Sequence, residues 1–400
     1  MSRSSMTVCA LIVFASVAWG AERERQDLPA NIPAPNTWVD AGLKFVPPEG
    51  IPDARWTTTD GYSGSTYRSR TGTVLWRTGI SSKAAGLSPG YYSNATLEWA
   101  PASSEARVID VFSAWGGGSY GHGRLLAGFE KHPMPAPRHV YDAFDYVETR
   151  DSIYLMLGSY WKVGLTGATE EARAQLTVDA GSTWRYAFAD RRWHRIDDSV
   201  RRLRPGVVPH GVTMQPWPEA NKILFFGPSG RHYAEFDLKS ERWKDVEITQ
   251  KRPRLKGAGP GSSTWDSKRQ LWVMRCGPQV YRFDPRKRTF DSLPPAYEVT
   301  EARRFKRNGY LGSGITYIPR HDVYLVHCPN GNDTHVYEIA KSRWMTVKGG
   351  DIALPFGNLA YDPKTDLTVL VWQLKAFRFR YVPRGPASVG STTQKAAPAP

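Results

Sequence analysis

The stretch TWRYAFADRRWHRID, Thr183 to Asp197, has close relatives further along the chain. In each copy an aromatic residue is followed by six residues centred on a basic turn and then by a second aromatic residue. Apolar and polar residues alternate on both sides of the turn, a pattern typical of two antiparallel strands joined as a hairpin. The aromatic pairs of the four copies are Tyr186 and Trp193, Phe236 and Trp243, Phe283 and Phe290, and Tyr337 and Trp344.

A second strand–turn–strand unit precedes each hairpin. It occupies residues 139–159, 211–227, 262–277 and 313–331. Each repeat therefore holds four strands, and the repeat length of about 50 residues is typical of propeller blades. A four-stranded sheet has two apolar faces that it cannot bury alone, so such units stack around an axis. The sequence predicts an all-β fold, a closed β-propeller of four-stranded blades.

Two incomplete-looking units set the number of blades. A weaker copy begins at Ser65 to Gly79, and the last copy begins at Asn358 to Trp372, which gives six blades, with seven as the alternative. The last copy ends after its third strand, Phe377 to Val382, whereas Asn36 to Leu43 resembles an outermost strand without inner partners. We predict that these two segments pair and close the ring, which removes the sheet edges.

The segment PAPRHVYDAFDYVETRDSIYLMLG, Pro135 to Gly158, resembles the blade opening of kelch and galactose-oxidase-type propellers. The resemblance covers about residues 37 to 382 and implies the fold rather than a function.

We expect the chain to divide into a signal peptide (1–20), a linker (21–36), the propeller (37–382) and a disordered, low-complexity tail (383–400). Arg3 followed by an apolar core and small residues is typical of a signal peptide, and the core is too short to span a membrane. We therefore expect a secreted or periplasmic protein without a membrane span, and a monomer.

Export leaves Cys276 and Cys328 in the mature chain. Both end the second strand of adjacent blades, where equivalent points lie further apart than a disulfide allows, so free or metal-bound thiols are expected. Together with His327 they are candidate zinc ligands by residue type. The sequence identifies no other cofactor, and a structural zinc or calcium ion is the alternative.

The net charge of +15 favours an acidic polymer as partner. Many basic residues fall in the hairpin turns, where they are interpreted as a solvated face. No nucleic-acid-binding motif accompanies the charge, so nucleic acid is not an expected partner. An acidic polysaccharide or another glycan is the expected one.

The connection into the first strand of a blade and the connection between its second and third strands emerge together. They lie at the face of the propeller opposite to the hairpin turns. Histidine, tyrosine and arginine gathered there would suit proton transfer on an anionic substrate. The catalytic candidates are His122, His139, Tyr160, Arg204 and His210, and the substrate-binding candidates are Arg77, Arg138, Trp161, Tyr186, Arg231, Arg275 and His327. The alternative for a single histidine is a structural hydrogen bond, and for Tyr186 it is packing between blades.

This residue set resembles that of propeller polysaccharide lyases such as the ulvan lyases, which usually have seven blades. The resemblance implies β-elimination on a uronate-containing polysaccharide, in which an arginine neutralises the carboxylate while a base and an acid transfer protons. Its roles fall on His122 or His139 as base, Tyr160 or Tyr186 as acid, and Arg204 or Arg138 as neutraliser, with His210 in support.

Two other functions are open. One is a non-catalytic kelch-type propeller that binds glycan or protein through its aromatic face. The other is a copper oxidase of the galactose-oxidase type, which would need a Tyr–Cys cofactor built on Cys276 or Cys328.

Overall fold

The structure is a computed structural model. It describes residues 32–46, 64–77, 80–81, 91–92, 96–110, 135, 140, 142–157, 181–196, 212–227, 232–248, 250, 263–276, 278–296, 314–327, 333–352, 354, 357–372 and 375–383.

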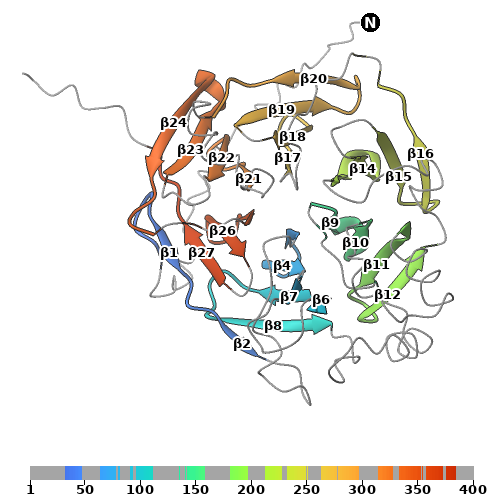
Figure 1. Cartoon of the computed structure of the whole chain (residues 1–400), viewed down its shortest axis with the longest axis horizontal. Helices are drawn as coiled ribbons and strands as arrows, with labels where there is room; N and C mark the ends of the chain where they lie inside the picture. Colours follow the sequence, from blue (N-terminus) through green and yellow to red (C-terminus); the bar gives the residue numbers. More distant parts are fainter. Residues whose placement is uncertain are drawn as a thin grey trace, which may run out of the picture.

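The described strands form six antiparallel blades around a common axis, a six-bladed β-propeller (Figure 1). Blade 1 holds β3 (Ser65–Arg68), β4 (Thr73–Arg77), β7 (Thr96–Trp99) and β8 (Glu105–Asp110). Blade 2 holds β9 (Phe144–Val147), β10 (Ser152–Met156), β11 (Thr183–Ala187) and β12 (Arg192–Ile196). Blade 3 holds β13 (Thr213–Trp217), β14 (Lys222–Phe226), β15 (Tyr233–Asp237) and β16 (Arg242–Asp245).

Blade 4 holds β17 (Ser263–Asp266), β18 (Leu271–Cys276), β19 (Gln279–Asp284) and β20 (Thr289–Ser292). Blade 5 holds β21 (Ile315–Ile318), β22 (Val323–His327), β23 (Asp333–Glu338) and β24 (Arg343–Lys348). Blade 6 holds β25 (Asn358–Asp362), β26 (Leu367–Trp372), β27 (Lys375–Phe379) and, from the other end of the chain, β1 (Trp38–Asp40). The predicted fold and the count of six are confirmed for the described residues.

The aromatic pairs that defined the repeat are direct cross-strand partners. Tyr186 faces Trp193, Phe236 faces Trp243, Phe283 faces Phe290 and Tyr337 faces Trp344, each from the third strand to the fourth. Their ring centroids lie 4.7–5.4 Å apart, within the range of favourable aromatic contacts. The recurring spacing thus reflects one hairpin register used in four blades.

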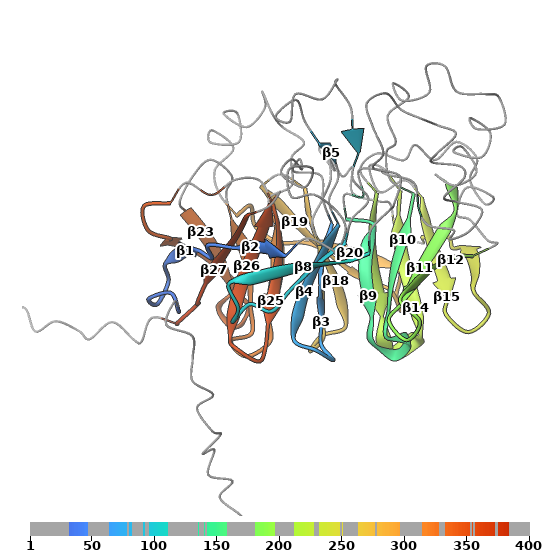
Figure 2. The ribbon, with the colours of Figure 1, turned by 90° about the horizontal axis from the view of Figure 1, so that it is seen from below.

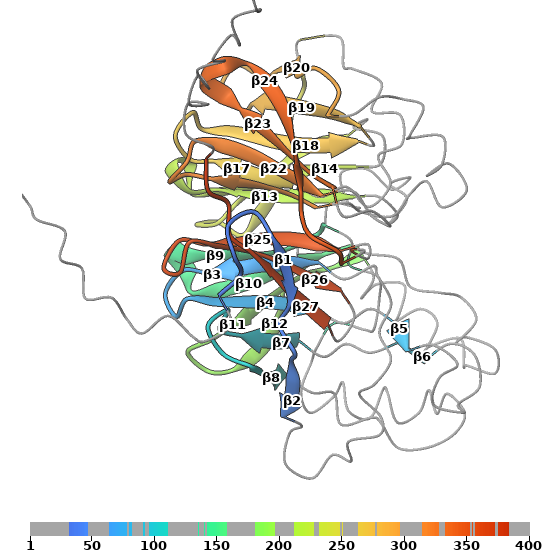
Figure 3. The ribbon, with the colours of Figure 1, turned by 90° about the vertical axis from the view of Figure 1, so that its left-hand side faces the viewer.

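The closing blade builds the same pair from two distant segments. Trp38 of β1 faces Phe379 of β27, with ring centroids 4.9 Å apart, and the indole Nε1 donates to Thr334 Oγ1 of blade 5 at 2.8 Å. Asn36 adds side-chain hydrogen bonds to the backbone of Val382. β1 therefore stands as the outermost strand of blade 6, next to β27 (Figure 3).

A fifth strand on blade 1 was not predicted. After β1 the chain turns at Gly42, whose φ is 59°, and β2 (Lys44–Val46) then pairs in parallel with β8. The segment from β1 to β2 thus crosses from the outer edge of blade 6 to that of blade 1 (Figure 1). Three residues with partial burial give too weak a pattern for sequence reasoning to recognise. A further short pair, β5 (Ile80–Ser81) and β6 (Tyr91–Tyr92), lies between β4 and β7 in the chain.

The core of the described residues lies between the blades. Each of the six interfaces between neighbouring blades holds a cluster of buried apolar side chains. The first strands of neighbouring blades also contact one another around the axis. Stacking of blade faces is therefore the main source of apolar burial, as expected for radially repeated sheets.

The ring has two ends, which carry different connections between strands. The hairpin end carries the turns from first to second and from third to fourth strand, seen along the lower edge of the blades in Figure 2. Because the strands alternate in direction, the second-to-third and blade-to-blade connections begin and finish at the opposite end, the connection end. Among the described residues, no helix is long and apolar enough to cross a membrane.

Candidate functional site

Three predicted substrate-binding residues lie at equivalent places, where second strands reach the connection end. Arg77 ends β4, Arg275 is the penultimate residue of β18, and His327 ends β22. All three are buried. They therefore lie at the predicted end of the ring, but their contacts are with protein groups.

Arg77 joins blades 1 and 2. Its guanidinium donates from Nη1 to Thr96 Oγ1 at 3.2 Å and from Nη2 to the carbonyl oxygen of Pro135 at 3.4 Å. The guanidinium carbon also lies 4.9 Å from the centroid of a Trp193 ring, a cation–π distance. In this arrangement Arg77 stabilises the interface between the blades.

Arg275 and His327 form a second such interface, between blades 4 and 5. Arg275 Nη1 donates to the carbonyl oxygen of His327 at 2.9 Å. The imidazole Nδ1 of His327 accepts from the backbone N–H of Gly314 at 3.1 Å, which leaves the proton of a neutral ring on Nε2. Beside them, burial and then the positive charge of Arg275 lower the pKa of His335 to about 4. His335 is therefore a buried neutral histidine next to an arginine, which suits a structural role.

Tyr186 lies near the hairpin end of β11 and belongs to the aromatic pair of blade 2. It is buried among Phe188 and Trp193, and its hydroxyl donates to the carbonyl oxygen of Ile109 in blade 1 at 3.2 Å. Tyr186 therefore contributes to the packing between blades 1 and 2, and its cross-strand partner Trp193 is the residue whose ring faces the Arg77 guanidinium.

Cys276 is a buried free cysteine. Burial raises the pKa of its thiol to about 12, so the group is a neutral thiol rather than the thiolate that binds metal. The described residues contain no group of three or more His, Cys, Asp or Glu side chains that could hold a metal ion. The described part of the chain thus offers no support for the zinc, calcium or copper options.

The remaining candidates lie outside the described residues: His122, Arg138, His139, Tyr160, Trp161, Arg204, His210, Arg231 and Cys328.

The axis holds a polar group that the sequence analysis did not single out. Asp142 lies two residues before β9, the inner strand of blade 2, and forms a parallel bridge with Thr213 of blade 3. Its carboxylate Oδ2 accepts hydrogen bonds from the hydroxyl of Thr213 and from Ser263 Oγ of blade 4, the latter at 2.6 Å. One carboxylate thus connects three blades at the connection end of the axis.

Asp145, three residues further into β9, makes the corresponding contacts towards blade 1. It accepts from the hydroxyl of Thr66 in blade 1, from its neighbour's backbone N–H, and from Gln215 Nε2 in blade 3 at 3.4 Å. Asp142 and Asp145 together therefore connect the inner strands of blades 1 to 4.

Both axial carboxyls hold protons more tightly than an ordinary aspartate. Burial raises the pKa of Asp145 to about 7, against the opposing hydrogen bonds from Thr66 and Tyr146. Burial also raises the pKa of Asp142 well above its ordinary range, although Ser263 and Thr213 stabilise the ionised form. Both side chains nevertheless keep part of their surface accessible. Carboxyls with perturbed pKa values in a partly accessible position are candidates for proton transfer and recognition.

Blades 5 and 6 approach each other differently at the axis. A Cβ added to Gly314, just before β21, would lie 2.6 Å from the backbone nitrogen of Leu359 in blade 6. This position therefore requires glycine for close backbone packing. The axis is asymmetric, with carboxyls, hydroxyls and an amide on blades 1 to 4 and close backbone packing between blades 5 and 6.

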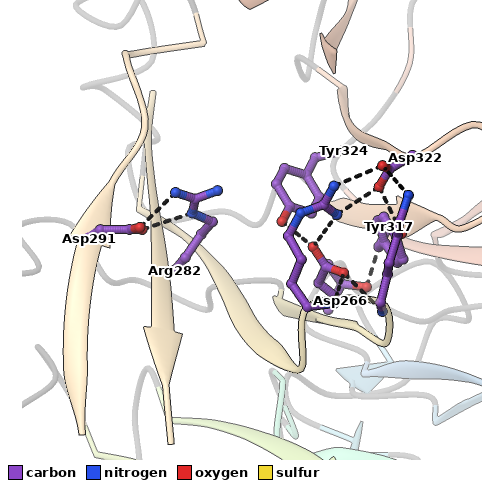
Figure 4. Close-up of polar contacts among 9 residues, drawn as sticks. Asp266, Arg282, Asp291, Tyr317, Asp322 and Tyr324 are labelled. Atoms are coloured by element: carbon purple, nitrogen blue, oxygen red, sulfur yellow. Dashed lines mark hydrogen bonds and ion pairs between the residues drawn. The ribbon is translucent and has the colours of Figure 1, made fainter. Parts of the chain in front are cut away.

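The hairpin end carries ion pairs between blades. Asp322 of blade 5 accepts from Arg269 of blade 4 through both oxygens, at 2.7 and 2.8 Å, and from Lys268 Nζ at 2.7 Å (Figure 4). Tyr317 donates to the same carboxylate at 3.0 Å, and Tyr324 donates to the buried Asp266 beside it. The bidentate contact with Arg269 holds the pKa of Asp322 well below its ordinary range.

The same geometry recurs at two other interfaces. Arg68 and Arg70 of blade 1 pair with Asp151 of blade 2, and Arg320 and His321 of blade 5 approach Asp366 of blade 6. The turn residues Lys287, Lys341 and Arg343 form ion pairs within their own hairpins. Part of the basic charge interpreted from sequence as a solvated face is thus neutralised by local carboxylates.

Comparison with known proteins does not assign this chain to a family. No family model matches the chain, and no curated protein matches it. Among solved structures it is similar to a structural genomics protein of unknown function from Bacteroides thetaiotaomicron VPI-5482, with 9% identity and a TM-score of 0.49. The similarity covers 80% of this chain and 69% of that one. The class of this protein, a six-bladed β-propeller, therefore rests on its own strand pairing.

Proposed function

We propose that this chain is an exported propeller that binds an acidic polysaccharide at the connection end of the ring. The observation that carries the proposal is the distribution of charge. At the hairpin end, Asp151, Asp322 and Asp366 neutralise basic side chains of the preceding blades. Most of the basic excess of the chain, whose net charge is +15, falls outside the described residues.

Three blade-to-blade connections are rich in basic residues. They follow β12, β16 and β20 and precede β13, β17 and β21, so the strands that flank them all meet them at the connection end. Their basic residues are Arg201, Arg202, Arg204, Lys251, Arg252, Arg254, Lys256, Arg303, Arg304, Lys306 and Arg307. Positive charge collected at one end of a ring attracts a polyanion, with an affinity that falls as salt screens it.

The test compares two charge-reduced variants of the mature protein in binding to a panel of acidic and neutral polysaccharides. Arg254→Gln with Lys256→Gln removes charge from a connection, and Arg286→Gln with Lys287→Gln removes the same charge from an exposed hairpin turn. We expect the first variant to lose affinity for an acidic polysaccharide by about fivefold or more at low salt, and the second to bind nearly as the parent protein does. Equal losses in both variants, or no binding to any acidic polymer, would refute the proposal.

Cleavage of the bound polymer by β-elimination is the second function that we propose. The observation that favours it is that His122, His139, Tyr160, Arg204 and His210 all fall in connections whose flanking strands meet them at the connection end. An elimination needs a base, an acid and a cation for the uronate carboxylate, and this set contains all three types.

The product of such an elimination absorbs ultraviolet light because it carries an unsaturated uronate. We expect absorbance to rise on an acidic polysaccharide with the parent protein and with a His194→Ala control, whose residue lies on the outer strand β12. The rise should be lost with His139→Ala. Binding without any rise would leave the non-catalytic propeller as the function.

A further inference from the structure

We propose that Asp142 and Asp145 form a pH-responsive clasp at the axis. When both carboxyls are uncharged, the clasp holds the inner strands of four blades together. When they are charged, they weaken the contacts between these strands and repel an acidic ligand. The clasp is the pair of carboxyls with their partners Thr66, Thr213, Gln215 and Ser263. The part that concerns the ligand rests on the proposed function, whereas the part that concerns the blades does not.

The geometry concentrates inter-blade contacts on two side chains. Asp142 contacts Thr213 and Ser263, which begin the inner strands of blades 3 and 4. Asp145 contacts Thr66 on the inner strand of blade 1 and Gln215 on that of blade 3. The hydrogen bonds to the carboxyls therefore cross three successive blade interfaces close to the axis.

Among the described residues, the groups that contact the clasp are uncharged apart from the carboxyls themselves. Its partners are two threonines, a serine, a glutamine and backbone N–H groups, and the charge that acts on Asp142 is that of Asp145. Among the described residues, the main influences on the pKa of the two carboxyls are burial, hydrogen bonds and, for Asp142, the charge of Asp145. Ionisation of both would thus place two like charges in a desolvated position, which favours entry of water or separation of the strands.

The direction of the pH effect follows from the raised pKa values. A carboxyl whose pKa is higher in the folded than in the unfolded protein stabilises the fold at low pH, and this stabilisation is lost as pH rises. For Asp145 the loss spans the range from the ordinary pKa of 3.8 to about 7. Ionised Asp142 and Asp145 also lie towards the connection end, where they would repel a polyanion.

The first experiment compares thermal unfolding of the parent protein with Asp145→Asn and Asp142→Asn between pH 4 and 8. Asparagine keeps the shape and cannot ionise, and the amide of Gln215 can rotate to accept from it. We expect parent and variants to melt within about 1 °C of each other at pH 4, and each variant to melt about 3 °C higher or more at pH 8. Differences that do not change with pH, or variants less stable at pH 8, would refute the clasp.

Asp190→Asn is the matched control. Asp190 is exposed. Burial is the largest single influence on its pKa and raises it, but the hydrogen bonds from His194 and Arg192 and the charge of His194 together lower the pKa below its ordinary value. Its substitution should lower the melting temperature at pH 8 or leave it unchanged, opposite to the axial variants. Hydrogen exchange in β9 and β13 of the parent protein provides a second measurement that needs no variant, with faster exchange expected at pH 8 after correction for the intrinsic rate.

The ligand part is tested by binding of the acidic polysaccharide at pH 5.5 and 8. Histidines elsewhere in the chain also titrate in this range, so the comparison between proteins decides. We expect the affinity of the parent protein to fall at least about threefold more than that of the doubly substituted Asp142→Asn, Asp145→Asn protein. Equal falls would overturn the ligand part alone. Absence of binding at both values would overturn the proposed function, while the unfolding experiment would still decide on the clasp.

Discussion

At the scale of single residues, Asp322 shows how much one residue of a hairpin turn contributes to the stability of the ring. Its carboxylate accepts from Arg269, Lys268 and Tyr317, and it is mostly buried against blade 4. Replacement by alanine would leave the Arg269 charge and the Tyr317 hydroxyl without this acceptor. We expect Asp322→Ala to lower the free energy of unfolding by about 2 kcal/mol at pH 7, measured by chemical denaturation.

The control for Asp322 is Arg286→Ala, an exposed change on the same end of the ring, with an expected effect within about 0.5 kcal/mol. Because the pKa of Asp322 is depressed in the folded protein, its contribution is present above the ordinary carboxyl pKa and lost as pH falls below it. The difference between parent and Asp322→Ala should therefore shrink in acid. A difference that persists unchanged at pH 2.5 would contradict the ionic account.

Cys276 gives a second prediction at this scale. Its buried thiol, with a pKa of about 12, should resist alkylation by iodoacetamide at pH 8 in the folded protein and react fully after denaturation. Mass spectrometry of the peptide that carries Cys276 measures this. Rapid reaction of the native protein would show that the thiol is accessible and ionised, as a metal ligand or cofactor precursor would require.

Sequence reasoning reached the positions of single residues better than their environments. Arg77, Arg275 and His327 do lie at the connection end of their strands, but a strand-terminal position does not tell whether a side chain turns into the blade interface. Asp142 and Asp145 were missed for a related reason. Their perturbed pKa values depend on burial in the assembled ring and on Thr66, Thr213 and Ser263, which belong to other blades and lie 71 to 121 residues away in the chain.

At the scale of elements, the recurring hairpin was predictable because its aromatic pair is fixed by strand register. An interval of seven residues across a turn places both rings on the same side of adjacent strands, as Tyr186 and Trp193 illustrate. The turn between the first and second strands of each blade is not marked by a recurring aromatic pair of this kind. It ends in a residue with positive φ, between 41° and 74°: Gly72, Asp151, Asn221, Gln270, Asp322 and Asp366.

Gln270 is the least suited of these turn residues. Its φ is 57°, a region that costs about 1 kcal/mol for a residue with a Cβ, and its side-chain oxygen is buried without a hydrogen-bond partner. We expect Gln270→Gly to raise the free energy of unfolding by about 0.5–1 kcal/mol. Ser267→Gly in the same turn should lower it instead, because a residue without positive φ gains nothing from glycine. A destabilised Gln270→Gly protein would contradict this reading of the turn.

At the scale of the whole molecule, closure depends on a strand at the other end of the chain. Trp38 is buried, packs on Phe379 and hydrogen-bonds to Thr334 of blade 5. We expect Trp38→Ala to lower the free energy of unfolding by about 3–4 kcal/mol, by loss of apolar burial and of that bond. Trp344→Ala, at the equivalent but less buried place in blade 5, should cost clearly less. Equal costs would indicate that β1 adds no more than an ordinary outer strand.

The ring could be predicted from the sequence because its units repeat. The asymmetry of the axis could not be predicted in this way. Six similar units predict a propeller whatever their exact contacts, because each unit must bury two apolar faces. The asymmetry arises from single departures from the repeat, such as the glycine at Gly314 and the carboxyls at Asp142 and Asp145. A single sequence gives no means of telling such departures from neutral variation.

Hydrogen exchange with and without the polymer would show whether an acidic polysaccharide binds at the connection end. We expect slower exchange at the connection-end termini of described strands, such as β4, β13, β17 and β22, and no change at the hairpin turns around Asp151, Asp322 and Asp366. Protection confined to the hairpin turns, or none at saturating acidic polymer, would contradict it.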